Sequence, residues 1–166
     1  MKIRTLATLV AICLCFSMIS ESALAGLDSK KAQYVGGTVS TIPSNTESLL
    51  NLTGESRMDF KWKAGDWQIP YSSVTSLEYG QHAGRRVGAT VALGVTTLGI
   101  GALPVLFSKK RRHYLTIAYM DSDGKAQAAI FELGKDAIRT SLTVLETRTG
   151  KKVDYEDEEA RKAGTK

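Results

Sequence analysis

Apolar and polar side chains alternate with a period of two residues in several stretches of the chain. Such runs occupy 57–63, 74–79 and 113–120. In the first of them, Met58, Phe60 and Trp62 alternate with charged residues. This period is typical of half-buried β-strands. The turn sequence Asp121–Gly124 then predicts a β-hairpin between the third run and residues 125–133.

Two further stretches are predicted to add strands. Residues 34–42 are rich in Thr, Val and Ile, which favour strands, and Pro43 ends this run. Pro70 interrupts the segment 67–79. We therefore expect two short strands around a turn in that segment.

The spacing of apolar residues changes to that of a helix toward the C-terminus. Ile138, Leu142 and Leu145 lie at positions i, i+4 and i+7 and form one stripe. Asp136 is placed to cap the start of this helix, and Gly150 to end it in a left-handed conformation. Strands followed by one helix predict a mainly β (α+β) fold: a small curved antiparallel sheet or barrel closed by a C-terminal amphipathic helix.

The segment 85–112 follows neither period. It contains 21 uncharged, glycine-rich residues, Val87 to Phe107, between the basic clusters Arg85-Arg86 and Lys109–Arg112. As one helix these residues would be about 31 Å long, enough to cross a hydrocarbon core of about 30 Å. A single crossing, however, would place the strands before and after it on opposite sides of a membrane, where they could not share one sheet.

Two other structures avoid this conflict. One is a helical hairpin with arms of about 15 Å that dips into one leaflet, with both basic clusters at the head groups. The other is an apolar element packed in the domain core. In the first case the segment contacts an anionic membrane surface or an envelope protein, and its glycines allow contact between copies in a homo-oligomer. The residues predicted to make these contacts are Arg85, Arg86, Val87, Gly88, Leu93, Leu98, Leu103, Phe107, Lys109, Lys110, Arg111 and Arg112.

The first 25 residues have the pattern of a secretory signal peptide. Lys2 and Arg4 precede the apolar run 5–19, and Ala23 and Ala25 form an A-x-A cleavage site. An uncleaved N-terminal anchor is the alternative. We expect an exported protein of the periplasm or cell envelope, associated with the membrane if the 85–112 segment enters it.

Composition limits the chemistry of the exported chain. Both cysteines, Cys13 and Cys15, lie in the predicted signal peptide, which would leave no thiol for disulfides or metal sites after cleavage. The net charge is +5, and two basic and one acidic residue in 1–25 leave +4 for the remainder. An exported protein rarely meets nucleic acid, so we expect no nucleic-acid partner. Residues 26–150 are predicted to form one domain, followed by a loose, charged tail at 151–166.

Four stretches share a pattern with one family of domains: YVGGTV, IPYSSVTSLEYG, KKRRHYLTIAYMDSDGKAQAAIFEL and IRTSLTVLETRTGKKV. They cover most of 34–153 and resemble bacterial pleckstrin-homology-like, GRAM-like domains. The resemblance implies a bent antiparallel sheet closed by the C-terminal helix, and a non-enzymatic module that binds lipid head groups or proteins. Phosphoinositide-binding members carry basic residues in the first hairpin loop. The corresponding segment 43–56 has no Lys or Arg, so phosphoinositide recognition is not expected.

Motifs for catalysis or metal binding are weak. The two histidines, His82 and His113, flank the 85–112 segment without an accompanying ligand motif. The DSDG sequence lacks the other carboxylates of a calcium loop. Asn51-Leu52-Thr53 is a glycosylation sequon, informative only in a eukaryotic secretory pathway. We expect no catalytic residue, metal or cofactor.

Two functions of different classes fit this pattern. The leading hypothesis is an exported, non-enzymatic pleckstrin-homology-like binding module that associates with the envelope membrane through 85–112. The alternative is a soluble protein-binding adaptor in which this segment belongs to the core. An enzyme without a recognisable motif is a third hypothesis. Dependence on detergent separates the first two.

Overall fold

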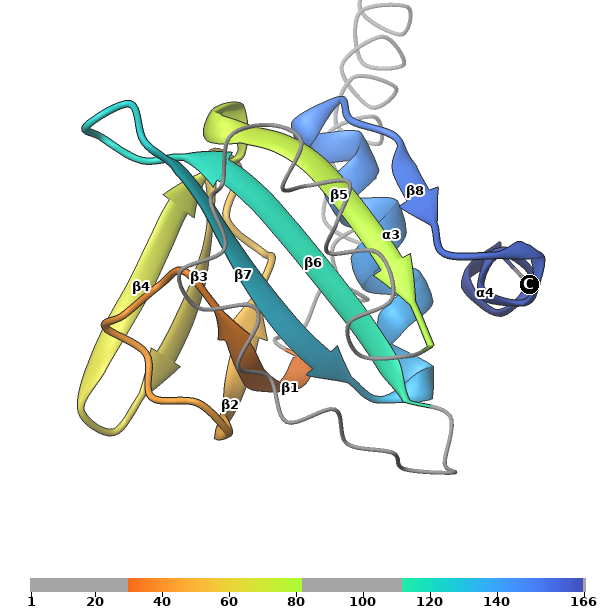
Figure 1. Cartoon of the computed structure of the whole chain (residues 1–166), viewed down its shortest axis with the longest axis horizontal. Helices are drawn as coiled ribbons and strands as arrows, with labels where there is room; N and C mark the ends of the chain where they lie inside the picture. Colours follow the sequence, from red (N-terminus) through yellow and green to blue (C-terminus); the bar gives the residue numbers. More distant parts are fainter. Residues whose placement is uncertain (1–29, 82–111, 166) are drawn as a thin grey trace, which may run out of the picture.

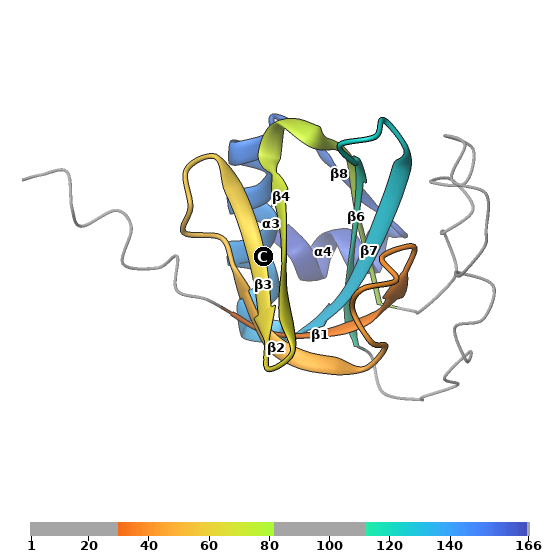
Figure 2. The same cartoon turned by 90° about the vertical axis from the view of Figure 1, so that its left-hand side faces the viewer.

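The strands form one curled sheet that bends around a central core (Figures 1 and 2). The structure is a computed structural model and describes residues 30–81 and 112–165. Its elements are β1 (Lys30–Gly37), β2 (Thr46–Asn51), β3 (Arg57–Trp62), β4 (Gly65–Pro70), η1 (Tyr71–Ser73), β5 (Val74–Gly80), β6 (His113–Met120), β7 (Ala126–Leu133), α3 (Lys135–Thr149), β8 (Val153–Tyr155) and α4 (Glu158–Thr165). The strand order in the sheet is β4-β3-β2-β1-β7-β6-β5-β8.

The predicted fold class is confirmed. Neighbouring strands pair antiparallel except β8, which runs parallel to β5, so the sheet is mixed. In β3, Met58 and Phe60 are fully buried and Trp62 is half-buried, as the alternation predicted. The interruption at Pro70 is also confirmed, because β4 ends there and η1 leads into β5.

The predicted hairpin is formed by β6 and β7. Met120 pairs with Ala126, and the turn between them has Gly124 at φ 73°. The carboxylate of Asp121 accepts hydrogen bonds from the backbone N–H groups of Asp123 and Lys125, at 3.0 and 2.8 Å. The DSDG sequence therefore acts as a turn, as expected.

Helix α3 covers the open side of the curled sheet (Figure 1). The predicted stripe of Ile138, Leu142 and Leu145 is buried in the core, and Gly150 ends the helix at φ 68°. The start differs from the prediction: Gly134 is the N-cap, and Asp136 lies in the first turn. The helix begins one residue before Asp136, so its carboxylate faces the positive end of the helix dipole without capping it.

Aromatic side chains hold the two halves of the sheet together. The ring of Phe131 in β7 lies 5.7 Å from Tyr34, 5.1 Å from Phe60 and 5.5 Å from Trp67, centroid to centroid. The indole Nε1 of Trp67 donates a 3.1 Å hydrogen bond to the hydroxyl of Tyr119 in β6. Side chains thus connect β4 to β6, although these strands share no backbone ladder.

The segment 43–56, expected as a hairpin loop, contains strand β2. Leu50 is fully buried, and β2 pairs with β1 on one side and with β3 on the other. The local sequence alternates too briefly to predict a strand. Pairing with both the preceding and the following strand compensates for this weak local preference.

The prediction of a loose tail at 151–166 is wrong. Strand β8 extends the sheet beside β5, and α4 follows it. Val153 is buried and Ala160 is fully buried. Gly164 is also buried: a Cβ there would lie 2.7 Å from the ring of Tyr155. Small residues let α4 pack closely, so contacts with the domain replace the missing large apolar side chains.

Candidate functional site

The predicted contact site lies almost wholly outside the described residues. Of the residues predicted for it, only Arg112 is described, because 82–111 is not. The structure does describe where this segment starts and ends. We call residues 82–111 the insert, and the described residues at its two ends, Tyr79 to Gln81 and Arg112 to Tyr114, the insert base.

The insert base brings both ends of the segment to one end of the sheet. Gly80 of β5 pairs with Tyr114 of β6 in the antiparallel ladder. The chain therefore leaves the sheet and re-enters it at neighbouring positions (Figure 1). The described strands β5 and β6, which precede and follow the undescribed segment, are therefore partners in one sheet.

The C-terminal region fastens one side of the insert base. The backbone N–H of Gln81 donates a 2.9 Å hydrogen bond to the carboxylate of Glu156, and the N–H of Glu156 donates one of 2.9 Å to the carbonyl of Tyr79. Glu156 lies between β8 and α4. The sequence region predicted as a loose tail thus fixes the point where the insert leaves the sheet.

On the other side, Arg112 makes an ion pair within the domain. Its Nη1 lies 2.7 Å from Oε2 of Glu132 in β7, and about a third of its side chain is exposed. Charge-assisted pairs of this length are among the stronger polar contacts. The charge of Arg112 is therefore partly neutralised, and its ion pair joins the start of β6 to β7.

Tyr79 and His113 form a partly buried polar contact at the insert base. The Tyr79 hydroxyl lies 2.5 Å from Nδ1 of His113, and the rings stack with centroids 5.9 Å apart. Burial raises the pKa of Tyr79. Burial also lowers the pKa of His113, and the nearby charges of Lys135 and Arg139 lower it further. The neutral imidazole is favoured, with Nδ1 as acceptor of the tyrosine proton.

This pKa shift predicts that acid weakens the fold. A histidine with a lowered folded pKa contributes stability that is fully present above its unfolded pKa of about 6.5 and is lost as the pH falls through the folded pKa. We expect the free energy of unfolding, measured in urea between about pH 8 and about pH 5, to fall with acid. His113→Gln should make the free energy of unfolding depend less steeply on pH. His82→Gln measures the contribution of the other histidine to this dependence. An unchanged slope in His113→Gln would contradict the prediction.

The histidines and carboxylates of the described residues do not form a metal site. Among residues 30–81 and 112–165, no group of three or more His, Cys, Asp or Glu side chains is placed to hold a metal ion. Within the same residues, no helix is long and apolar enough to cross a membrane.

The outer face of β6 and β7, opposite the core, is also buried. Its residues Tyr114, Thr116, Ala118, Ala128 and Ile130, and Val35 of the neighbouring strand β1, are all less than a tenth exposed. None of them belongs to the core cluster that packs against α3 and α4. The alternation in 113–120 predicted two faces but not that both would be buried. This second apolar face lies next to the insert base, because Tyr114 belongs to both.

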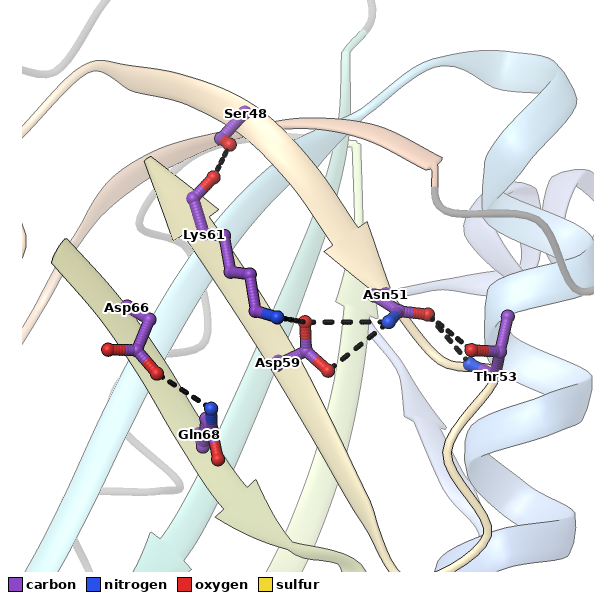
Figure 3. Close-up of polar contacts among 7 residues, drawn as sticks. All are labelled: Ser48, Asn51, Thr53, Asp59, Lys61, Asp66 and Gln68. Carbon is purple, nitrogen blue, oxygen red and sulfur yellow. Dashed lines mark hydrogen bonds and ion pairs between the residues drawn. The ribbon is translucent and has the colours of Figure 1, made fainter. Parts of the chain in front are cut away.

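The outer face of β2, β3 and β4 is polar and internally bonded (Figure 3). The Asn51 amide Nδ2 donates to both carboxylate oxygens of Asp59, at 3.2 and 3.4 Å, and Lys61 lies 4.0 Å from the same carboxylate. The Asn51 Oδ1 accepts two hydrogen bonds from Thr53, at 3.0 and 2.8 Å. The sequon asparagine is therefore engaged at both side-chain atoms within the fold.

No protein-family model matches this chain, and no curated protein shows significant similarity to it. The fold defines a class: a curled, mainly β sheet covered by C-terminal helices, with a long apolar insert between its paired strands β5 and β6. The insert and the insert base are the most distinctive feature of this fold.

Proposed function

We propose that the protein is an exported, non-enzymatic binding module of the pleckstrin-homology-like kind, which associates with the anionic surface of the envelope membrane through residues 85–112. The observation that carries this proposal is the pairing of Gly80 with Tyr114. It returns the insert to the end of the sheet from which it departs. On this proposal both basic clusters lie on the same side of the membrane, as a segment that enters and leaves one leaflet requires.

The physical argument has an apolar part and a charged part. Two helical arms of about 15 Å reach to the middle of a hydrocarbon core of about 30 Å. Each Lys or Arg beside an anionic leaflet contributes about 1 kcal/mol. Glycines in the insert permit close contact between arms or between copies, which supports self-association. The signal-peptide pattern in residues 1–25 supports export.

Binding of the exported form to lipid vesicles tests the proposal. We expect this form to begin at Gly26 and to bind vesicles of mixed phosphatidylglycerol and phosphatidylethanolamine. Glutamine at Arg85, Arg86, Lys109, Lys110 and Arg111 should weaken binding strongly at low salt and little at high salt, because only the charged part is screened. Arg112 is left unchanged, since its loss would leave Glu132 without its ion-pair partner.

A matched variant controls for net charge. It carries glutamine at five exposed basic residues on other parts of the domain: Arg57, Lys63, Lys125, Lys151 and Lys152. We expect this variant to bind nearly as the unmodified chain does. No binding of the unmodified chain, or equal losses in the two variants, would contradict a contact through the insert flanks.

The second candidate function is the soluble protein-binding adaptor in which the insert belongs to the core. The burial of the outer face of β6 and β7 favours it, because an apolar face beside the insert base is already removed from solvent. In that case the exported form should stay in solution without detergent and leave vesicles unbound.

A further inference from the structure

Basic side chains of the described chain gather at the end of the molecule where the insert leaves the sheet. Lys31 of β1 and Gly134 before α3 line one open hollow of about 410 Å³. Lys135 follows directly, and Arg139 lies one turn further along α3. Both are close enough to His113 at the insert base to act on it electrostatically. We call Lys31, Lys135 and Arg139 the basic end.

The basic end is available to a partner. All three side chains are exposed, and neither Lys31 nor Lys135 makes an ion pair with another described residue. Arg139 donates its Nε to the carbonyl of Ala163, at 3.0 Å, which holds α4 against α3. Positive charge there is thus fixed in place by the fold.

The side of this end formed by the starts of β1 and α3 carries net positive charge. Besides the basic end it includes Lys30, which gives four basic residues, and the acidic residues Glu47 and Asp136 reduce this to +2. Glu156 and Asp157 lie on the other side of the insert base, beside Tyr79. Arg112 and Glu132 cancel each other in their ion pair. The opposite end of the β6–β7 hairpin instead carries Asp121 and Asp123 in its turn (Figure 1).

We propose that the basic end is a second contact with anionic lipid head groups and that it sets the orientation of the domain on the membrane. This inference rests on the proposed function, because the insert brings this end of the sheet to the surface. Charges within a Debye length of about 10 Å contribute to such a contact. The far end of α3 lies about 20 Å away along the helix and is screened.

Two double variants with the same change in charge test the orientation. Lys31→Gln with Lys135→Gln removes two charges from the basic end, and Lys151→Gln with Lys152→Gln removes two exposed charges beyond the far end of α3. The vesicles are mixed phosphatidylglycerol and phosphatidylethanolamine, with pure phosphatidylcholine as the uncharged arm. We expect about 25-fold weaker binding for the first variant at low salt, from about fivefold per lysine near the leaflet, and less than about twofold for the second.

A label provides an independent measurement of the orientation. In a chain with Cys13→Ser and Cys15→Ser, the only two cysteines are removed, and Lys135→Cys or Lys151→Cys introduces one thiol for a fluorophore. A quencher on the lipid head groups should reduce the emission at position 135 and leave that at 151 nearly unchanged. If a double variant is destabilised, as a changed urea midpoint would show, the quenching measurement still tests the orientation.

The outcomes separate the two proposals. Equal loss of binding in both double variants, with equal quenching at both labels, overturns the orientation and leaves the proposed function standing. An unmodified chain that binds no anionic vesicle overturns the proposed function and this inference together. Binding of the same strength to the uncharged vesicles overturns the basic end as a contact, and leaves the apolar insert to account for association.

Discussion

Replacing Phe131 by alanine should lower the free energy of unfolding by about 3–5 kcal/mol, as is usual for a fully buried phenylalanine. The ring is inaccessible to solvent. It contacts aromatic rings from β1, β3 and β4 while it belongs to β7. Alanine would leave a cavity at the point where the two halves of the sheet meet, and packed neighbours fill such a cavity only in part.

Urea denaturation followed by tryptophan fluorescence measures this loss. Met120→Ala in the paired strand β6 is the matched control, because Met120 is 40% exposed. Surface substitutions of this kind usually change stability by less than about 0.5 kcal/mol. A cost for Phe131→Ala as small as that of the control would mean that the halves of the sheet do not share one core.

Replacing residues 87–107 by a short Gly/Ser loop should abolish vesicle binding at every salt concentration and leave the domain folded. The apolar part of binding is nearly independent of salt, so its removal differs from neutralising the basic flanks. Gly80 and Tyr114 are paired neighbours, and a short flexible loop can connect their strands at little entropic cost. The curled sheet and α3 pack against each other through the described core.

This replacement also decides between the two candidate functions. Vesicle sedimentation measures binding, and near-ultraviolet circular dichroism with the urea midpoint measures folding. If the loop variant unfolds, the insert is part of the core and the soluble adaptor is correct. If it folds and still binds anionic vesicles as before, the insert is not the membrane contact.

The likeness to pleckstrin-homology-like domains stays a prediction about family, while the fold class that it implied is observed. A bent sheet covered by a C-terminal helix is the architecture expected. The phosphoinositide argument changes in one respect, because the segment without basic residues is partly strand β2 and not only a loop. The basic residues that the structure does gather lie elsewhere, at the starts of β1 and α3.

Local periodicity was sufficient for the elements whose burial follows their own sequence. The alternation around Phe60 predicted β3, the turn at Gly124 predicted the β6–β7 hairpin, and the stripe through Leu142 predicted α3. In β3 and α3 the large apolar residues lie on one face, which is the buried one. Such a pattern states which face is buried before any partner is known.

Only the tertiary structure decided the features that depend on contacts between elements. Strand β2 and the region beyond Gly150 have weak patterns of their own, and they are ordered by pairing and close packing with other elements. The ion pair of Arg112 with Glu132 and the bond from Gln81 to Glu156 join residues 20 and 75 positions apart. Lys31 and Lys135 are likewise far apart in sequence, and only the fold brings them together beside the insert base. The sequence of each segment shows the spacing of its apolar residues. Which strands become partners in the sheet depends on how all the segments together bury their apolar faces.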